Sequence, residues 1–287
     1  MAPSINNNAL TALIGQILPA ASTAGFYLAP VRGLSGESWR IDSPLGSWLA
    51  RSDSGAGRLM GVCRRREFRV LRHVDGQSLA PSPVAYRDGW LIVAWIPGVP
   101  LTPSDIPARL ADGTLAGMLA RLHHLPAYGY PLPLKALLDS HWRHMSPARR
   151  TPALLRLHRR FMRSPLPPTL RLSPLHLDIH ADNVLATEGG CRLIDWEYAA
   201  DGDIALELAA LSRAMASEAA LWPTFLTDYC RHWRGIPLPL LTRRIGQWLP
   251  WVDYLMLMWF EVRWRQTGEP ACRCSAQSLR QRMGLPW

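Results

Sequence analysis

The pattern of apolar and polar residues changes along the chain, from short runs near the start to helical repeats further on. Between 9 and 18, leucine and isoleucine recur three and four residues apart, which predicts an amphipathic helix covering a small N-terminal lobe. Pro19 limits how far this helix continues. From Leu110 onward helical spacing dominates, as in the apolar stripe of Leu115, Met118, Leu119 and Leu122. The second half is therefore expected to be mainly helical.

Shorter apolar runs before residue 97 predict strands. Residues 39–41 and 47–51 flank a turn sequence at 42–46, which predicts a hairpin. Residues 90–96 form a continuous apolar run, typical of a strand buried on both faces. Between these strands, 64–74 carries its apolar residues on one side and predicts a helix.

A boundary between two lobes is expected where the last of these runs ends. Pro97-Gly98-Val99-Pro100 and the polar residues up to Pro107 have the composition of a connection. We therefore expect an α+β, two-lobed architecture. A small N-terminal lobe of residues 1–97 would hold an antiparallel sheet, and residues 98–287 would form a larger, mainly helical lobe.

The residues best suited to chemistry lie between 174 and 203. His176, Asp178 and Asn183 have the spacing H-x-D-x-x-x-x-N of a kinase catalytic loop. In that loop the aspartate accepts the proton of the attacking hydroxyl, and the asparagine coordinates magnesium. The pattern alone can arise by chance, so its surroundings decide its meaning.

A predicted hairpin follows this loop. Residues 184–186 and 191–194 form two short, mainly apolar runs that flank a Gly-Gly turn. If the turn is centred on Gly189, Asn183 and Asp195 face each other at the open end, with Cβ atoms about 5 Å apart. Their side chains offer the oxygen ligands that suit Mg²⁺ carrying a triphosphate. Loop and hairpin together indicate a site of phosphoryl transfer, with Asp195-Trp196-Glu197 in the place of the kinase D-F-G.

At these residues the sequence resembles the aminoglycoside phosphotransferase and choline kinase superfamily, and within it the bacterial thiamine kinases. The resemblance rests on RLSPLHLDIHADN at 171–183, LIDWEYAADGDIALELAAL at 193–211 and WFEVRWRQTG at 259–268. It covers most of the chain but is dense only in these stretches. It implies a protein kinase-like fold, ATP and Mg²⁺ as cofactors, and transfer of the γ-phosphoryl group to an alcohol.

A kinase-like small lobe implies residues that bind the ATP phosphates. Glycines allow close approach of backbone amides to phosphate, and serine can donate as well, which suggests Gly33, Ser35 and Gly36. The alternative for this stretch is an ordinary turn. Arg51 stands where protein kinases have lysine, and a guanidinium also binds phosphate. Glu67 is its expected partner, or else a solvated helix residue.

Further residues are assigned supporting roles. Backbone groups of Ala94 and Ile96 are expected to contact adenine. His176 supports the catalytic loop, and His180 is expected to be structural or to lie on the phosphate side, because Asp178 already has the position of the base. Asp203 would brace the magnesium loop by resemblance, although an acid at a helix start is also explained by the helix dipole.

The resemblance to thiamine kinases implies thiamine as the alcohol. The C-terminal part is rich in tryptophan, and a flat cationic ring stacks on such side chains while acids balance its charge. Most of these tryptophans are expected in the core. The candidates for substrate contact are Trp196, Glu197, Trp259, Glu261 and Trp264.

Two alternatives remain open. The substrate could be another small alcohol, such as an aminoglycoside, choline or a sugar. An aminoglycoside is a polycation and requires an acidic pocket, whereas this half of the chain is aromatic and basic. The chain could also be a non-catalytic ATP-binding module, against which the intact Asp178, Asn183 and Asp195 argue.

Charge and cysteine content narrow the remaining possibilities. The formal net charge is +10, but the arginines are scattered and accompany no nucleic-acid-binding pattern, so no nucleic-acid partner is expected. Five cysteines, an odd and scattered set, fit free thiols in a reducing cytosol. No signal peptide or membrane-spanning run is evident. We expect a cytoplasmic monomer that contacts no membrane.

Overall fold

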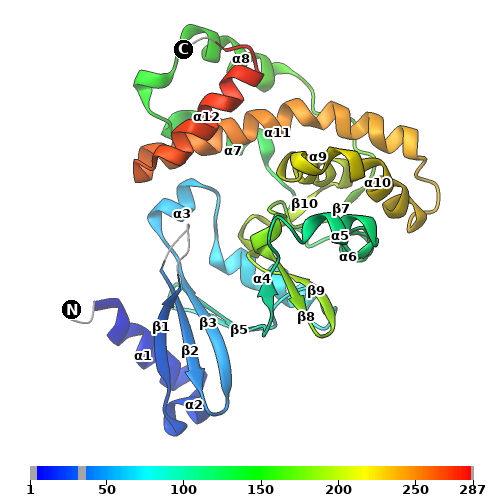
Figure 1. The fold of residues 1–287 in the computed structure, drawn as a ribbon. Coiled ribbons are helices and arrows are strands. Elements are labelled where there is room, and N and C mark those ends of the chain that lie inside the picture. The colour runs from blue at the N-terminus through cyan, green and yellow to red at the C-terminus, as the bar shows by residue number, and fades with distance from the viewer. Residues whose placement is uncertain (1–4, 32–36, 286–287) are drawn as a thin grey trace. The chain divides into compact units, whose positions relative to one another are not determined.

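The computed structural model describes residues 5–31 and 37–285 of the chain (Figure 1). Packing divides the chain into two compact units, which are described one at a time. The first comprises Met1–Arg58, Val62–Pro100 and Leu185–Tyr198. The second comprises Leu59–Gly61, Leu101–Val184 and Ala199–Trp287. The predicted lobes are continuous stretches of chain and stay a prediction, whereas these units are discontinuous in sequence.

The first unit is built on a five-stranded antiparallel sheet with the order β1-β2-β3-β5-β4. The strands are β1 (Tyr27–Val31), β2 (Ser38–Ser43), β3 (Gly46–Ser52), β4 (Pro83–Arg87) and β5 (Trp90–Ala94). The predicted hairpin is confirmed as β2 and β3, and the apolar run becomes β5, which lies between two neighbours. Its side chains are buried from Trp90 to Val93, which explains the absence of polar alternation in the run.

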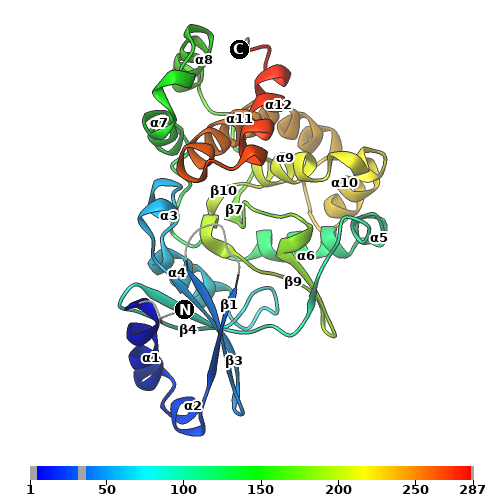
Figure 2. The ribbon, with the colours of Figure 1, turned by 60° about the vertical axis from the view of Figure 1, so that its left-hand side comes forward.

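Helices accompany this sheet. The predicted first helix is confirmed as α1 (Ile5–Ile17), followed by α2 (Pro19–Ala24). Leu10, Leu13 and Ile14 of α1 join a buried cluster with residues of β2, β3 and β5, so the apolar face of α1 covers one side of the sheet (Figure 2). Two further helices follow β3, α3 (Gly55–Leu59) and α4 (Arg64–Val74). The second confirms the helix predicted over 64–74.

A small sheet of order β6-β8-β9 completes the first unit. Its strands are β6 (Val99–Pro100), β8 (Val184–Thr187) and β9 (Gly190–Leu193). The predicted hairpin is confirmed, with Glu188 and Gly189 as its turn, so the centre lies between them and not on Gly189. Gly98 approaches β8 so closely that a Cβ atom there would stand 2.8 Å from the carbonyl oxygen of Ala186.

The second unit is mainly helical, as predicted. Its helices are α5 (Ile106–Ala111), α6 (Thr114–His124), α7 (Leu134–His144), α8 (Pro152–Arg163), α9 (Ile204–Ala214), α10 (Trp222–Arg231), α11 (Leu238–Thr267) and α12 (Pro270–Arg282). The apolar stripe of α6 is buried, as its spacing predicts. The 30-residue α11 packs against α7, α9 and α12. Two short strands, β7 (Leu172–Leu175) and β10 (Ala200–Asp203), pair antiparallel and lead into the site and into α9.

Two observations bear on the expected environment of the protein. Among the helices that the structure describes, none is long and apolar enough to cross a membrane. All five cysteines are free thiols. The cytoplasmic location and the monomeric state stay predictions.

Candidate active site

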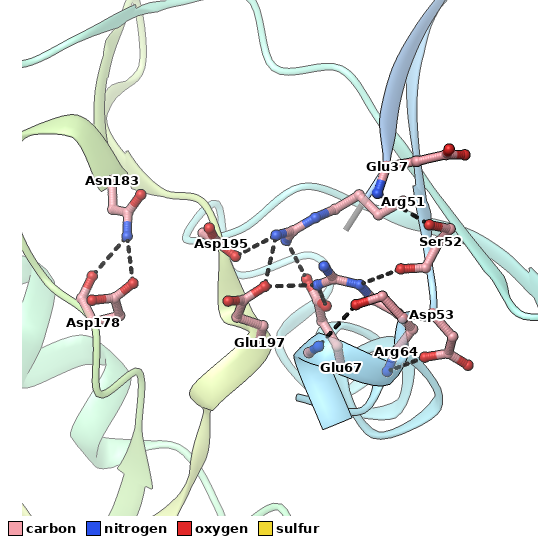
Figure 3. Close-up of polar contacts among 12 residues, drawn as sticks. Glu37, Arg51, Ser52, Asp53, Arg64, Glu67, Asp178, Asn183, Asp195 and Glu197 are labelled. Atoms are coloured by element: carbon pink, nitrogen blue, oxygen red, sulfur yellow. Dashed lines mark hydrogen bonds and ion pairs between the residues drawn. The ribbon is translucent and has the colours of Figure 1, made fainter. Parts of the chain in front are cut away.

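Asp178 and Asn183 of the predicted catalytic loop are held together by direct hydrogen bonds (Figure 3). The side-chain nitrogen of Asn183 donates to the carbonyl oxygen of Asp178 at 2.9 Å and to its carboxylate Oδ2 at 3.0 Å. Asn183 is buried, whereas one third of the Asp178 side chain is exposed. The amide thereby fixes the orientation of a carboxylate that solvent or a substrate can reach.

The start of the loop is anchored by Glu207 of α9, a residue to which the sequence analysis assigned no role. Its Oε1 accepts hydrogen bonds from the consecutive backbone amides of His176, at 2.8 Å, and Leu177, at 2.5 Å. Leu177 has a φ of 67°, a left-handed conformation that is uncommon for a residue other than glycine. Two amides on one buried carboxylate stabilise this turn, which leads directly into Asp178.

Glu207 is itself held by a buried chain of hydrogen bonds. Its Oε2 lies 2.7 Å from Nε2 of His123 on α6, and Nδ1 of the same ring lies 2.7 Å from the hydroxyl of Tyr229 on α10. Burial raises the pKa of Tyr229 well above its ordinary value, so its hydroxyl keeps its proton. Tyr229, His123 and Glu207 therefore form one continuous chain of hydrogen bonds through the two nitrogens of the His123 ring. Three helices thus fix the geometry of the loop.

The two histidines of the loop have different surroundings. His176 is fully buried, and its Nδ1 accepts from the backbone amide of Asp178 at 3.3 Å. The supporting role predicted for it stays a prediction. His180 is partly exposed, and its ring lies between the carboxylates of Asp178 and Asp182. It precedes a short 3-10 helix over Ala181–Asn183.

In the first unit, Arg51 of β3 forms a buried cluster of ion pairs (Figure 3). Its Nη1 donates to Glu67 of α4 at 2.8 Å, which confirms the predicted pair. Its Nη2 donates to Asp195 at 2.7 Å and to Glu197 at 2.8 Å. Arg64 adds a second guanidinium, whose Nη1 binds Glu67 at 2.6 Å and Glu197 at 2.9 Å. Two arginines therefore share three carboxylates.

Charge in this cluster is finely balanced. Burial opposes the charge of Arg51, but Glu67, Asp195 and Glu197 outweigh it and raise the pKa of the guanidinium. Burial, followed by the negative charge of Asp195, raises the pKa of Glu197 to about 7, against the lowering effect of the two arginines. Two guanidiniums do not fully compensate three buried carboxylates, and Glu197 is the carboxylate whose charged form is disfavoured. Asp195 keeps the most exposed side chain, at 32%.

The segment Asp195-Trp196-Glu197 turns sharply after β9. Asp195 has a φ of 64°, in the left-handed region, and a 3-10 helix covers Trp196–Tyr198. The indole of Trp196 is fully buried and donates to the carbonyl oxygen of Leu193 at 2.9 Å. The substrate contacts predicted for Trp196 and Glu197 stay predictions. In the structure both side chains are buried within the first unit.

The predicted nucleotide contacts lie at the end of β5 and before β2. The amide of Ala94 donates to the carbonyl oxygen of Ser82 at 2.8 Å. Beyond it, the amide of Ile96 has no hydrogen-bond partner among the described residues. Gly33, Ser35 and Gly36 lie outside the described residues.

The C-terminal candidates belong to α11, and Glu261 is the most buried of them. Its carboxylate binds Arg149 through two hydrogen bonds, of 2.5 and 2.8 Å, and Arg280 of α12 at 2.8 Å. Trp264 lies under the guanidinium of Arg149, 5.0 Å from the ring centre, and Trp259 packs edge-on against Phe260. Their predicted substrate contacts stay predictions.

Asp203 and Asp201 show how β10 ties the second unit together. Asp203 caps α9 through the amide of Ala205 and also accepts from the amide of Leu170, at 3.2 Å in each case, so its expected place at a helix start is confirmed. Its predicted bracing of a magnesium loop stays a prediction. Asp201, to which the sequence assigned no role of its own, accepts from three successive amides, those of Tyr128, Gly129 and Tyr130.

Asn183 in the second unit and Asp195 in the first each carry an oxygen of the kind that binds magnesium, and each is described within its own unit. Because the amide nitrogen of Asn183 is bonded to Asp178, its Oδ1 is the atom directed elsewhere and can serve as a ligand. Asp195 offers a partly exposed carboxylate. No group of three or more histidine, cysteine, aspartate or glutamate residues is placed to hold a metal in the described part of the chain. A Mg²⁺ ion carried by a nucleotide needs only one or two protein carboxylates, so the lack of such a group is compatible with magnesium binding.

Comparison with known proteins identifies the class. The model of the phosphotransferase enzyme family matches residues 29–244. The chain therefore belongs to this family, and the predicted phosphotransferase is confirmed. The choline kinase of Streptococcus pneumoniae has the same fold, with a TM-score of 0.76 at 15% identity over 97% of this chain and 98% of its own. The predicted protein kinase-like α+β fold is confirmed.

Curated relatives narrow the class further. A thiamine kinase of Escherichia coli O6:K15:H31 is 37% identical over 239 residues, which cover 83% of each chain. A thiamine kinase of Escherichia coli O1:K1 is 35% identical over 270 residues, which cover 93% of each chain. The resemblance noted from the sequence is confirmed.

Proposed function

We propose that this protein is a thiamine kinase, which transfers the γ-phosphoryl group of ATP to the hydroxyl of thiamine and forms thiamine phosphate. The observation that carries the proposal is the 35–37% identity to thiamine kinases over most of both chains. The described site supplies the chemistry, because it holds a carboxylate in a fixed orientation beside an asparagine. Such a pair is what phosphoryl transfer to an alcohol requires.

Asp178 acts as the base. Its carboxylate orients the hydroxyl and accepts its proton as the oxygen–phosphorus bond forms, while ADP leaves with the electron pair of the broken bond. The hydrogen bonds from Asn183 and the anchoring of the preceding residues by Glu207 hold this carboxylate in one place. Because the carboxylate of Asp178 is already oriented, it needs little reorganisation to reach the transition state, and this lowers the activation barrier of phosphoryl transfer.

Asn183 and Asp195 are the residues that would hold Mg²⁺, which neutralises phosphate charge when it is bound. The Oδ1 of Asn183 and the carboxylate of Asp195 are hard oxygen ligands of the kind that this ion prefers. Both residues also occupy the metal-ligand positions that the kinase sequence pattern predicts. Arg51, held by Glu67, carries positive charge for the phosphates in place of the kinase lysine.

The remaining nucleotide contacts are proposed for backbone amides at and beyond the end of β5 and for the glycine- and serine-containing stretch before β2. The amide of Ala94, the last residue of β5, already donates to the carbonyl oxygen of Ser82, whereas the amide of Ile96, two residues beyond, has no hydrogen-bond partner among the described residues. The amide of Ile96 can therefore donate to adenine. Gly33, Ser35 and Gly36 are proposed for the phosphates on sequence grounds alone.

For the substrate, the aromatic residues of α11 are the best-supported candidates. Trp259 and Trp264 are partly exposed, whereas Glu261 is fully buried and bound by two arginines. A tryptophan face suits the cationic thiazolium ring of thiamine. The buried residues Glu261, Trp196 and Glu197 are then expected to stabilise the structure around the site instead of contacting thiamine.

A substrate panel tests the assignment. The purified chain is incubated with ATP and Mg²⁺ and with thiamine, choline or kanamycin, and ADP formation gives kcat/KM for each. We expect thiamine to be preferred by at least about 100-fold, because buried groups shaped for one substrate reject analogues that leave them unpaired. A preference for choline or kanamycin would support phosphoryl transfer to an alcohol but contradict thiamine as the substrate. ATP binding without turnover of any alcohol would favour a non-catalytic module.

A further inference from the structure

Arg263 of α11 is a buried cation without a counter-ion. Four arginines are buried in the part of the chain that the structure describes, and three of them, Arg51, Arg64 and Arg280, form ion pairs with buried carboxylates. Arg263 is 8% exposed, yet its side chain forms no ion pair and no hydrogen bond with a described residue. An unpaired charge is costly to bury, so arginine is rarely buried without an anion beside it.

The side chain of Arg263 lies beside the start of α12. Gly268, with a φ of 69°, ends α11 in a left-handed conformation, and α12 then packs back against α11 (Figure 1). Cys272 is the third residue of α12, and the positive charge of Arg263 opposes the rise in the pKa of its thiol that burial causes. The guanidinium is therefore directed toward the first turn of α12.

This first turn has backbone groups available to an anion. The helix spans 13 residues and has no side-chain cap at its N-terminus, where Pro270 lacks an N–H group. The amide of Ala271 has no hydrogen-bond partner among the described residues. The carboxylate of Glu269 lies 3.7 Å from Sγ of Cys272 and forms no ion pair with Arg263. The end of the helix thus adds partial positive charge beside an uncompensated guanidinium.

We propose that Arg263 and the first turn of α12 bind the phosphate group of a small molecule, either inorganic phosphate or a phosphate monoester. The planar guanidinium can donate to two phosphate oxygens at once, and the amide of Ala271 can donate to a third. A phosphate group near neutral pH carries between one and two negative charges, which suits a guanidinium together with a helix N-terminus. This binding site does not depend on which alcohol the protein phosphorylates.

The test compares the wild type with Arg263→Met and with Arg265→Met. Arg265 is an exposed arginine two positions along the same helix and donates to the carbonyl oxygen of His144, which makes it a matched control. Thermal unfolding is followed in potassium phosphate and in potassium chloride of equal ionic strength. Saturating AMP-PNP and Mg²⁺ occupy the nucleotide site, and their binding is measured first, so a failure of the proposed kinase function is seen separately.

Phosphate should stabilise only the proteins that keep Arg263. At a phosphate concentration about tenfold above Kd, the unfolding midpoint of the wild type and of Arg265→Met should rise by about 3 °C. The midpoint of Arg263→Met should not respond to phosphate. An equal rise in the wild type and Arg263→Met would overturn the proposal, and so would a rise in potassium acetate as large as that in phosphate.

Two further probes separate the sources of the phosphate group. A rise with inorganic phosphate, lost in Arg263→Met, assigns the site to free phosphate. A rise with thiamine phosphate but with neither thiamine nor inorganic phosphate, again lost in Arg263→Met, assigns it to the monoester. Absence of a rise with both phosphate compounds in the wild type would overturn the proposal.

A second variant keeps the charge of the side chain. Should Arg263→Met fold poorly, Arg263→Lys takes its place, and titration calorimetry with inorganic phosphate or thiamine phosphate gives its Kd. Because an ammonium group lacks the planar fork, this Kd should be about tenfold above that of the wild type. An unchanged Kd would show that the side chain at position 263 does not bind the phosphate group.

Discussion

Glu207 and Leu177 are joined by a hydrogen bond of 2.5 Å, from the backbone amide of Leu177 to a buried carboxylate oxygen. This contact lies one residue before Asp178, at the point where the backbone takes a left-handed conformation. The conformation of the loop therefore depends on hydrogen bonds to Glu207 of α9 as well as on the sequence of the loop.

Glu207→Gln should lower kcat more than it raises KM. The amide retains one acceptor but places a donor toward His123 and removes the charge that both loop amides bind. A displacement of Asp178 by a fraction of an ångström to about 1 Å can cost up to about 100-fold in rate. Steady-state kinetics and thermal unfolding check this, with Glu188→Gln in the exposed hairpin turn as the control. An unchanged kcat would show that the loop keeps its shape without the carboxylate.

Arg280 and Arg282 of α12 provide a matched pair for stability. Arg280 is buried and binds Glu261, whereas Arg282 is half exposed and shares Asp253 with Arg213. Arg280→Met should reduce the free energy of unfolding by about 3–5 kcal/mol, because it removes one partner of a buried carboxylate. Arg282→Met should cost less than about 1 kcal/mol.

The same pair tests the role of Glu261. Urea unfolding gives the two free energies, and the KM for thiamine is measured beside them. A small loss of stability in Arg280→Met together with a raised KM would place Glu261 at the substrate instead of in the framework. A large loss of stability with an unchanged KM would support the framework.

Gly98 should tolerate no side chain. An added Cβ would lie 2.8 Å from the carbonyl oxygen of Ala186 and 3.1 Å from Cγ2 of Thr187, so β6 and β8 would have to separate. Gly98→Ala should reduce the free energy of unfolding by about 1–3 kcal/mol. Gly189→Ala is the control, since nothing lies within 4 Å of the position of its Cβ. Equal unfolding midpoints for the two variants would contradict the close approach.

His141 of α7 should make stability depend on pH. It is buried, and neither ring nitrogen has a hydrogen-bond partner in the part of the chain that the structure describes. Burial, with a smaller effect of His144, lowers its pKa from 6.5 to about 4. Between pH 6.5 and 4, His141 is therefore protonated in the unfolded chain and neutral in the folded chain. Stability falls as the pH drops from 6.5 toward 4, by up to about 3 kcal/mol from this group.

Replacing the ring removes that effect. His141→Leu should flatten the fall between pH 6.5 and 4, and at pH 7 it should change stability little, because no hydrogen bond is lost. Chemical unfolding at pH 7, 6 and 5 provides the comparison, with His232→Gln as an exposed control. Parallel pH curves for wild type and His141→Leu would show that His141 is protonated in the folded protein.

The sequence predicted the elements whose signal is local. The helix α1, the strands β2, β3 and β5 and the hairpin after the loop all follow from periodicity and turn residues. Arg51 and Glu67 were paired correctly because the kinase pattern assigns both positions, and the structure joins them at 2.8 Å. These predictions needed no knowledge of distant packing.

Other contacts could not be predicted because they join segments far apart in the chain. Glu261 meets an arginine 112 positions earlier, so its burial is invisible in the tryptophan-rich stretch around it. Glu207 lies in an apolar helix, where a single acid at position 207 suggests a solvated face. In the structure it is buried, and the available signal was the apolar residues on both sides of it in the sequence, since an acid buried among them requires a partner.

The most direct test of the account is formation of thiamine phosphate by the purified chain. The wild type and Asp178→Asn are compared with ATP, Mg²⁺ and thiamine, and the product is separated from thiamine and quantified. The account predicts product with the wild type and at least about 1,000-fold slower formation with Asp178→Asn, while both bind ATP equally. Equal rates for the two proteins, or no thiamine phosphate from a wild type that binds ATP, would contradict it.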